Sequence, residues 1–155
     1  DSKLKGVGGW LIVVIFGLLY SLYNQGSTVY ITFSALTDGT IEQLSSITGL
    51  AGATTFELVV STILFGFIIY LLFLIKKEKK NFPKFYIYFL VAATIYSFLD
   101  AYIISSLNFP NIEIRKELIG EENTIYVDAT KALISSLIWG AYMRRSRRVK
   151  LTFVK

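Results

Sequence analysis

The chain has 155 residues, of which 54% are hydrophobic and 17% charged, and its mean hydropathy is +0.55. Ordinary soluble domains carry about 25% charged residues, so this composition excludes that class and indicates an integral membrane protein. The net charge of +5 falls in blocks between apolar runs, and the absence of cysteine and histidine excludes disulfides, imidazole catalysis and the usual zinc sites.

The first apolar run, GVGGWLIVVIFGLLYSLYN at residues 6–24, belongs to a stretch without charge between Lys5 and Asp38. It contains the roughly 20 residues that cross a hydrocarbon core of about 30 Å, so we predict the first transmembrane span here. A secretory signal peptide is the alternative, but the apolar run is long and no small-residue cleavage pattern follows it.

Residues 25–56 form the next segment, which is too long for a structureless connection in a compact domain. Within it, hydrophobic residues recur at every third position from Ile41 to Leu50, after Asp38 and Thr40, which are suitable N-caps. We therefore expect a short extra helix in this outer loop, lying over the outer face of the bundle or in the membrane interface.

Two further apolar runs predict the second and third spans. Residues 58–75 are uncharged between Glu57 and Lys76, and they form the clearest span of the chain. Residues 85–107 contain one acidic residue, Asp100, toward their far end. Each run is long enough to cross the hydrocarbon core as a helix.

The fourth predicted span, residues 124–143, is the least apolar because Asp128 and Lys131 interrupt it. At 3.6 residues per turn, their spacing places both on one face of a helix together with Thr124 and Ser135. If this segment were a soluble helix, the basic block after it would lie on the acid-rich side of the membrane. The charge pattern therefore favours a span.

The charges between the spans predict the orientation, because short cytoplasmic segments carry an excess of Lys and Arg. Thirteen of the sixteen basic residues precede the first span, separate the second from the third, or follow the fourth. We therefore predict an all-α integral membrane protein, a four-transmembrane-helix bundle in which residues 1–155 form one membrane domain and both termini are cytoplasmic. The expected location is the bacterial inner membrane, which a multi-pass chain without cysteine fits.

Ionisable residues at membrane depth form the first candidate site. A rise of about 1.5 Å per residue places them at similar heights, in the outer half of the bilayer. The predicted cluster comprises Glu57, Asp100, Asp128 and Lys131. Charges inside a membrane usually face the bundle interior or water and mark a ligand, ion or proton site. The alternative is a structural ion pair or a hydrated rim, with Lys131 extending to the surface.

Two terminal motifs carry a resemblance to a known family. The first span begins GVGGWLIVVIFGL, and the chain closes on IWGAYMRRSRRVKLTFV. These segments resemble domain of unknown function 2569, a family of uncharacterised bacterial membrane proteins, in the GGWL-like entrance and in the tyrosine, the serine, the RVK triplet and the threonine-phenylalanine pair at the exit. The resemblance covers nearly the whole chain. It implies a four-span inner-membrane protein and does not imply a reaction.

The resemblance also points to a second candidate site, because both motifs lie at the cytoplasmic side. This site comprises Gly8, Gly9, Trp10, Tyr142, Arg144, Arg145, Ser146, Arg147, Arg148 and Lys150. We expect the three entrance residues to pack against Ser146, Arg148 and Lys150. Anchoring to anionic lipid headgroups is one interpretation, and contact with a protein partner is the other. Nucleic acid is a poorer interpretation, because no aromatic residues are interleaved among the arginines.

Three classes of function are compatible with these features. The leading one is a non-enzymatic structural, accessory or sensing bundle that binds a lipid or small ligand in an outer-facing polar cleft. A transporter or channel subunit with Asp100, Asp128 and Lys131 along a polar path is the alternative. An enzyme is disfavoured, because no nucleophile motif or carboxylate pair has specific spacing. We expect no catalytic residue, metal or cofactor, and the expected partners are membrane lipids, a second copy of the chain or another membrane protein.

Overall fold

The computed structural model describes residues 2–155, except for the side chains of residues 2, 122 and 123. Its long helices are α1 (Trp10–Thr37), α3 (Leu50–Lys76), α4 (Phe82–Ser105) and α6 (Glu122–Arg145). Its short helices are the 3-10 helix η1 (Ser2–Leu4) and the α-helices α2 (Thr40–Gln43), α5 (Ile112–Ile119) and α7 (Arg147–Thr152). The predicted all-α fold is confirmed for this part of the chain.

The first helix runs further than the first predicted span. It has 28 residues, or about 42 Å, which exceeds the roughly 30 Å of a hydrocarbon core. The helix continues through Gly26 because that glycine lets α1 approach α3 closely, and an added Cβ would lie 3.2 Å from the Phe65 ring. The connection predicted over residues 25–56 is therefore corrected to residues 38–49, and α2 is the short helix within it.

The helices α4 and α6 lie close to their predicted spans, whereas α3 begins at Leu50, before the predicted start at residue 58. Local sequence explains how several helices begin or end. Pro83 occupies the first turn of α4, where its missing N–H would have no helical partner. The side chain of Asn111 accepts a hydrogen bond of 2.8 Å from the Ile114 N–H and so caps α5. Ser146 has extended backbone angles, which end α6 and turn the chain into α7.

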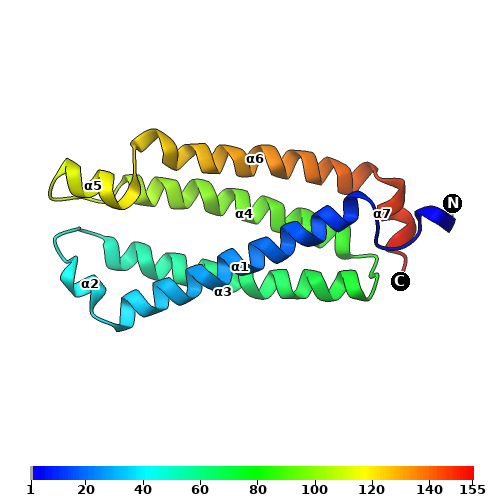
Figure 1. Cartoon of the computed structure of the whole chain (residues 1–155), viewed down its shortest axis with the longest axis horizontal. Coiled ribbons are helices and arrows are strands. Elements are labelled where there is room, and N and C mark those ends of the chain that lie inside the picture. Colours follow the sequence, from blue (N-terminus) through cyan, green and yellow to red (C-terminus); the bar gives the residue numbers. More distant parts are fainter. Residues whose placement is uncertain (1) are drawn as a thin grey trace.

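The long helices pair as two antiparallel hairpins, α1 with α3 and α4 with α6, and the two hairpins meet along α3 and α4 (Figure 1). Both chain termini, α7 and the α3–α4 turn gather at one end, which we call the basic end. The opposite end carries α2 and α5, and we call it the loop end. At the loop end the Thr48 N–H donates to the Asn108 carbonyl at 3.2 Å, which connects the two hairpins at that end.

The buried core is concentrated toward the basic end. It comprises Leu11, Val14 and Leu18 of α1, Leu64, Ile68, Leu71, Leu74 and Ile75 of α3, Phe82, Tyr86 and Phe89 of α4, and Met143, Val149 and Phe153 near the C-terminus. In contrast, α6 carries large exposed apolar residues such as Leu137 and Ile138. Such exposure is expected where a helix faces lipid and not water.

Three helices of the described part, α1, α3 and α4, are long and apolar enough to cross a membrane. They indicate a membrane protein, as the composition predicts. The helix α6 has 24 residues, the same number as α4, but Asp128, Lys131 and its terminal arginines make it less apolar.

Candidate functional site

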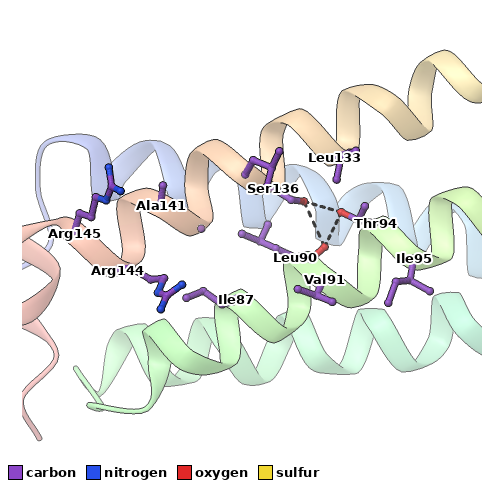
Figure 2. Close-up of a pocket in the computed structure, with 12 residues that line it drawn as sticks. Ile87, Leu90, Val91, Thr94, Ile95, Leu133, Ser136, Ala141, Arg144 and Arg145 are labelled. Carbon is purple, nitrogen blue, oxygen red and sulfur yellow. Dashed lines mark hydrogen bonds between the residues drawn. The ribbon is translucent and has the colours of Figure 1, made fainter.

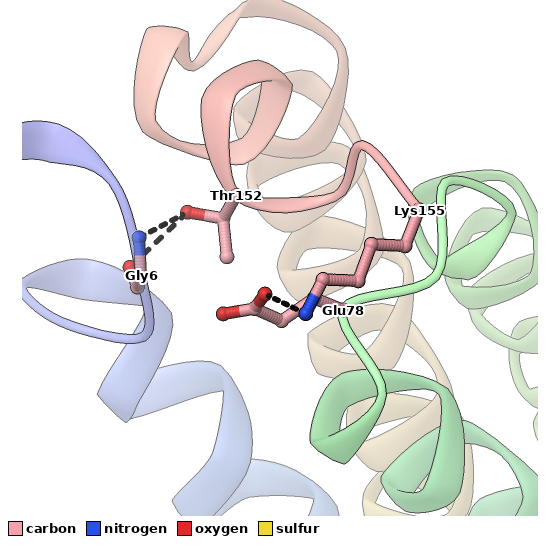
Figure 3. Close-up of polar contacts among 4 residues, drawn as sticks. All are labelled: Gly6, Glu78, Thr152 and Lys155. Carbon is pink, nitrogen blue, oxygen red and sulfur yellow. Dashed lines mark hydrogen bonds and ion pairs between the residues drawn. The ribbon is translucent and has the colours of Figure 1, made fainter. Parts of the chain in front are cut away.

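The basic end is closed by a clasp, which we define as Gly6, Gly8, Gly9, Arg148 and Thr152. Thr152 is 0% exposed. Its hydroxyl donates to the Gly6 carbonyl at 3.1 Å and accepts from the Gly6 N–H at 3.0 Å (Figure 3). One side chain thus satisfies both backbone groups of a residue 146 positions away.

The entrance glycines complete the clasp through Arg148. A Cβ added at Gly8 would lie 2.8 Å from Nη1 of Arg148, so the guanidinium occupies the space that a side chain would need. Gly9 has φ 56° and ψ −137°, a combination that only glycine adopts readily. Trp10 is 68% exposed and does not take part in this packing. The Ser146 side chain instead accepts from the Val149 N–H and caps α7.

The C-terminal tail extends the clasp to the α3–α4 turn. The Lys80 N–H donates to the Lys155 carbonyl at 2.7 Å, and the Lys155 ammonium lies 3.1 Å from the Glu78 carboxylate. The Phe153 ring stacks on Phe82 at 4.6 Å between centroids. Together with the Gly6–Thr152 hydrogen bonds, these contacts connect the N-terminal segment, the C-terminal segment and the α3–α4 turn at the basic end.

The remaining residues of the second predicted site divide by exposure. Tyr142 is half-buried and packs edge-on against Trp139, with 5.8 Å between ring centroids. Arg144, Arg145, Arg147 and Lys150 are exposed. The structure thus brings Gly8 and Gly9 to Arg148, and it leaves these four cations exposed at the basic end.

The predicted polar cluster is only partly assembled. Asp100 and Asp128 line one pocket of about 330 Å³ at the loop end, together with Tyr96. Residues of α5 cover this pocket. Glu57 on α3 interacts electrostatically with Asp100 but does not line this pocket.

Lys131 differs from the two aspartates in position. It is exposed and is not among the residues that line the pocket. Three positions along a helix correspond to about 300° of rotation, so Lys131 points about 60° away from Asp128. Residues three apart on a helix are close enough to pair, but the described part of the chain shows no ion pair between Asp128 and Lys131.

A larger groove lies between α4 and α6, toward the basic end (Figure 2). Its volume is about 800 Å³. Apolar side chains form its walls: Ile87, Val91 and Ile95 from α4, and Leu133 and Leu137 from α6. Leu137 is 66% exposed, so the groove opens to the surroundings of the helices.

A polar rung crosses the floor of this groove. The Thr94 hydroxyl donates to the Leu90 carbonyl at 2.9 Å, and its oxygen lies 2.8 Å from the Ser136 hydroxyl oxygen. The rung connects α4 to α6 and leaves its own hydroxyls paired. An apolar chain can therefore lie over it without leaving an unpaired donor against hydrocarbon.

Basic residues and a small residue shape the end of the groove that lies nearest the basic end. Arg144 and Arg145 line that end, where Figure 2 shows both. Gly140 lies one turn before Arg144, and a Cβ added there would meet no atom within 4 Å. The missing side chain keeps the groove hollow below the arginines.

A second groove runs along α1 and α3. Its volume is about 720 Å³, and its described lining includes Gly26, Tyr30 and Phe65 but no charged residue. It is comparable in size to the α4–α6 groove and lacks a basic end. Of these two grooves in the described part of the chain, the α4–α6 groove is the one that combines an apolar trough with cations.

Sequence reasoning did not identify Thr94, Ser136 and Gly140 as site residues. The four-residue spacing of Ser136 and Gly140 is a small-xxx-small pattern, which marks a face that another helix or a chain can approach closely. That pattern is common in membrane helices, so it does not by itself single out a groove. The local sequence of α6 also does not indicate that residues of α4 form the opposite wall of the groove.

Comparison with known proteins adds a family and no activity. The family described as "Protein of unknown function (DUF2569)" matches residues 4–154. No curated protein and no solved structure matches the chain. The match spans both end motifs, so the predicted resemblance is confirmed.

Proposed function

The chain belongs to the DUF2569 family of unknown function, and we propose that it is a non-enzymatic, four-span protein of the bacterial inner membrane that binds a membrane lipid. In this role it acts as a structural, accessory or sensing component and not as a catalyst. The carrying observation is the apolar groove between α4 and α6, which opens to the lipid-facing side of the bundle and ends in two arginines.

The packing of α6 supports a fourth span. Its 24 residues correspond to about 36 Å, and it lies antiparallel along α4, which is apolar enough to cross a membrane. A helix that pairs with a spanning helix over such a length lies at the same depth. Asp128 is then close to the outer headgroups, where its cost is small.

The charge distribution supports cytoplasmic termini. The basic end collects Lys76, Lys77, Lys79 and Lys80 of the α3–α4 turn and the arginines that follow α6. The loop end carries acids such as Glu42, Glu113 and Glu117. An excess of Lys and Arg marks the cytoplasmic side of short loops, so the basic end faces the cytoplasm.

Lipid binding in the groove is tested by filling it. The variant Gly140→Leu adds an isobutyl group at a lining residue of the groove, where an added Cβ would meet no atom within 4 Å. Gly17→Leu is the matched control, because Gly17 has the same open surroundings on α1, outside the groove. After purification in mild detergent, native mass spectrometry measures retained phospholipid. The leucine side chain of Gly140→Leu should displace contacts of about two lipid methylene groups and so lower the amount of retained lipid about tenfold. The control Gly17→Leu should retain as much lipid as wild type. Equal retention in all three proteins contradicts the proposal.

A transporter or channel subunit is the second candidate, because Asp100 and Asp128 line one pocket. Lys131 is not part of that pocket, so the polar path would depend on the two carboxyl groups alone. Reconstitution in proteoliposomes tests this role through ion or proton flux. Flux that is lost in Asp100→Asn and in Asp128→Asn supports it, and flux that is unchanged in both variants contradicts it.

A further inference from the structure

We infer that the α4–α6 groove selects an anionic phospholipid of the cytoplasmic leaflet, with the headgroup phosphate at Arg144 and Arg145 and one acyl chain along the trough. This inference rests on the proposed lipid binding and adds the headgroup class, the leaflet and the residues that select them. The groove contributes both parts that such a lipid requires: a cationic end and an apolar trough.

The length of the groove fits one leaflet. From Arg144 to Leu133 the lining covers eleven residue steps of α6, which is about 16 Å of helix. Half of a hydrocarbon core is about 15 Å. A chain whose headgroup lies at Arg144 therefore reaches the bilayer centre near Leu133, and the groove ends there.

The charge at the inner end is not neutralised by the protein. Both arginines are exposed, and neither forms an ion pair within the described part of the chain. The nearby Glu78 is paired with Lys155 instead. Guanidinium groups bind phosphate oxygens in a bidentate manner, so each of the two arginines can hold a phosphodiester at this end of the groove.

The trough suits an acyl chain from the headgroup inward. Gly140 and Ala141 leave room directly below the arginines, and exposed Leu137 and Ile95 line the path farther in. The hydroxyl groups of the Thr94–Ser136 rung are already paired and present no free donor to the chain. Each part of the groove thus matches the polarity of the lipid segment that would lie there.

The second groove, which runs along α1 and α3, provides an internal comparison. It has a similar volume, but its described lining has no charged residue, so it cannot distinguish headgroups by charge. Headgroup preference is therefore expected to depend on α6. Substitutions in α6 separate this preference from general affinity of the protein for lipid.

The test is a lipid titration of the delipidated full chain, followed by native mass spectrometry. Dioleoyl phosphatidylglycerol is compared with dioleoyl phosphatidylethanolamine for wild type and for Arg144→Gln/Arg145→Gln. The control Arg147→Gln/Lys150→Gln removes the same charge from exposed positions outside the groove. Two basic residues near an anionic headgroup correspond to about 5- to 30-fold in affinity. We expect the groove variant to lose phosphatidylglycerol affinity by this factor and to keep phosphatidylethanolamine affinity, and we expect the control to resemble wild type.

Two results would overturn the inference. One is an unchanged phosphatidylglycerol preference in the groove variant. The other is an equal loss in the control, which would mean a general surface charge effect. The single substitutions Arg144→Gln and Arg145→Gln, each expected to show about a fivefold loss, provide a milder test of the same site.

Further measurements distinguish a phospholipid from a free phosphate ester, and they distinguish headgroup selection from lipid binding itself. Glycerol 1-phosphate has the headgroup chemistry without acyl chains and is expected not to displace phosphatidylglycerol; displacement at equal concentration overturns the lipid assignment. If both phospholipids bind wild type equally and Gly140→Leu weakens both, the proposed function stands and the headgroup inference fails. If Gly140→Leu weakens neither, the proposed function itself fails.

Discussion

The hydroxyl of Thr152 is the most informative single group at the basic end. The variant Thr152→Val keeps the shape of the side chain and removes both hydrogen bonds to Gly6. Each such bond contributes about 0.5–1.5 kcal/mol net, so the free energy of unfolding should fall by about 1–3 kcal/mol. Since Thr152 is fully buried and Gly6 is half-buried, water can only partly replace the lost partner.

The matched control is Thr130→Val. Thr130 is exposed, and its hydroxyl donates only to the Tyr126 carbonyl one turn earlier in the same helix. This substitution should change the free energy of unfolding by less than about 0.5 kcal/mol. The two variants thus make the same chemical change at a clasp position and at a simple helical surface position.

The assay is unfolding by sodium dodecyl sulfate in mixed micelles, followed by tryptophan fluorescence. Hydrogen exchange of the Gly6 amide adds a local measurement, and exchange should be faster in Thr152→Val because the acceptor of that N–H is gone. If Thr152→Val and Thr130→Val have the same stability and the same Gly6 exchange rate, the clasp does not hold the termini as argued.

Two further predictions use backbone conformation and pH. Gly9→Ala should destabilise the protein by about 1–3 kcal/mol because Gly9 has a positive φ. Gly52→Ala, at a position in open space on helix α3, should stabilise it by about 0.5–1 kcal/mol. Effects of the same sign on unfolding in micelles would contradict this prediction. Hydrogen bonds from the Thr40 hydroxyl and N–H lower the pKa of Asp38 below its ordinary value of 3.8. The ionised Asp38 side chain therefore stabilises the folded state fully above pH 3.8, and this contribution is lost as the pH falls through the lowered pKa. A carboxyl titration by NMR should show a low midpoint that Thr40→Val moves back toward 3.8, and identical midpoints would refute the assignment.

Much of the fold follows from the sequence. The lengths of the apolar runs predict helices near residues 58–75 and 85–107, because a bilayer requires about 20 apolar residues per span. The charge pattern predicts the helix near residues 124–143, although Asp128 and Lys131 interrupt that run. The basic blocks predict which helix ends gather together, and the structure places both termini at one end with the α3–α4 turn. These features depend on the composition of each segment and on the spacing of its charged residues, and both can be read from the local sequence.

Where α1 ends was not predictable in this way. Gln25 and Gly26 look like the start of a loop, yet the helix continues to Thr37 because Gly26 lies against Phe65 of α3. The polar cluster illustrates the same limit. Depth along each span was estimated from the rise per residue, but only the packed helices show that Asp100 and Asp128 line one pocket and that Lys131 does not.

The sequence by itself therefore determined the membrane class, the family motifs and the charged ends, since hydropathy and charge act residue by residue. Tertiary structure alone decided that Thr152 reaches Gly6 across 146 positions and that Arg148 occupies the space beside Gly8. It also decided that α4 and α6 leave a groove between the Thr94–Ser136 rung and the arginines. These features depend on how helices rotate and approach one another, and that geometry is set by contacts between residues far apart in the chain.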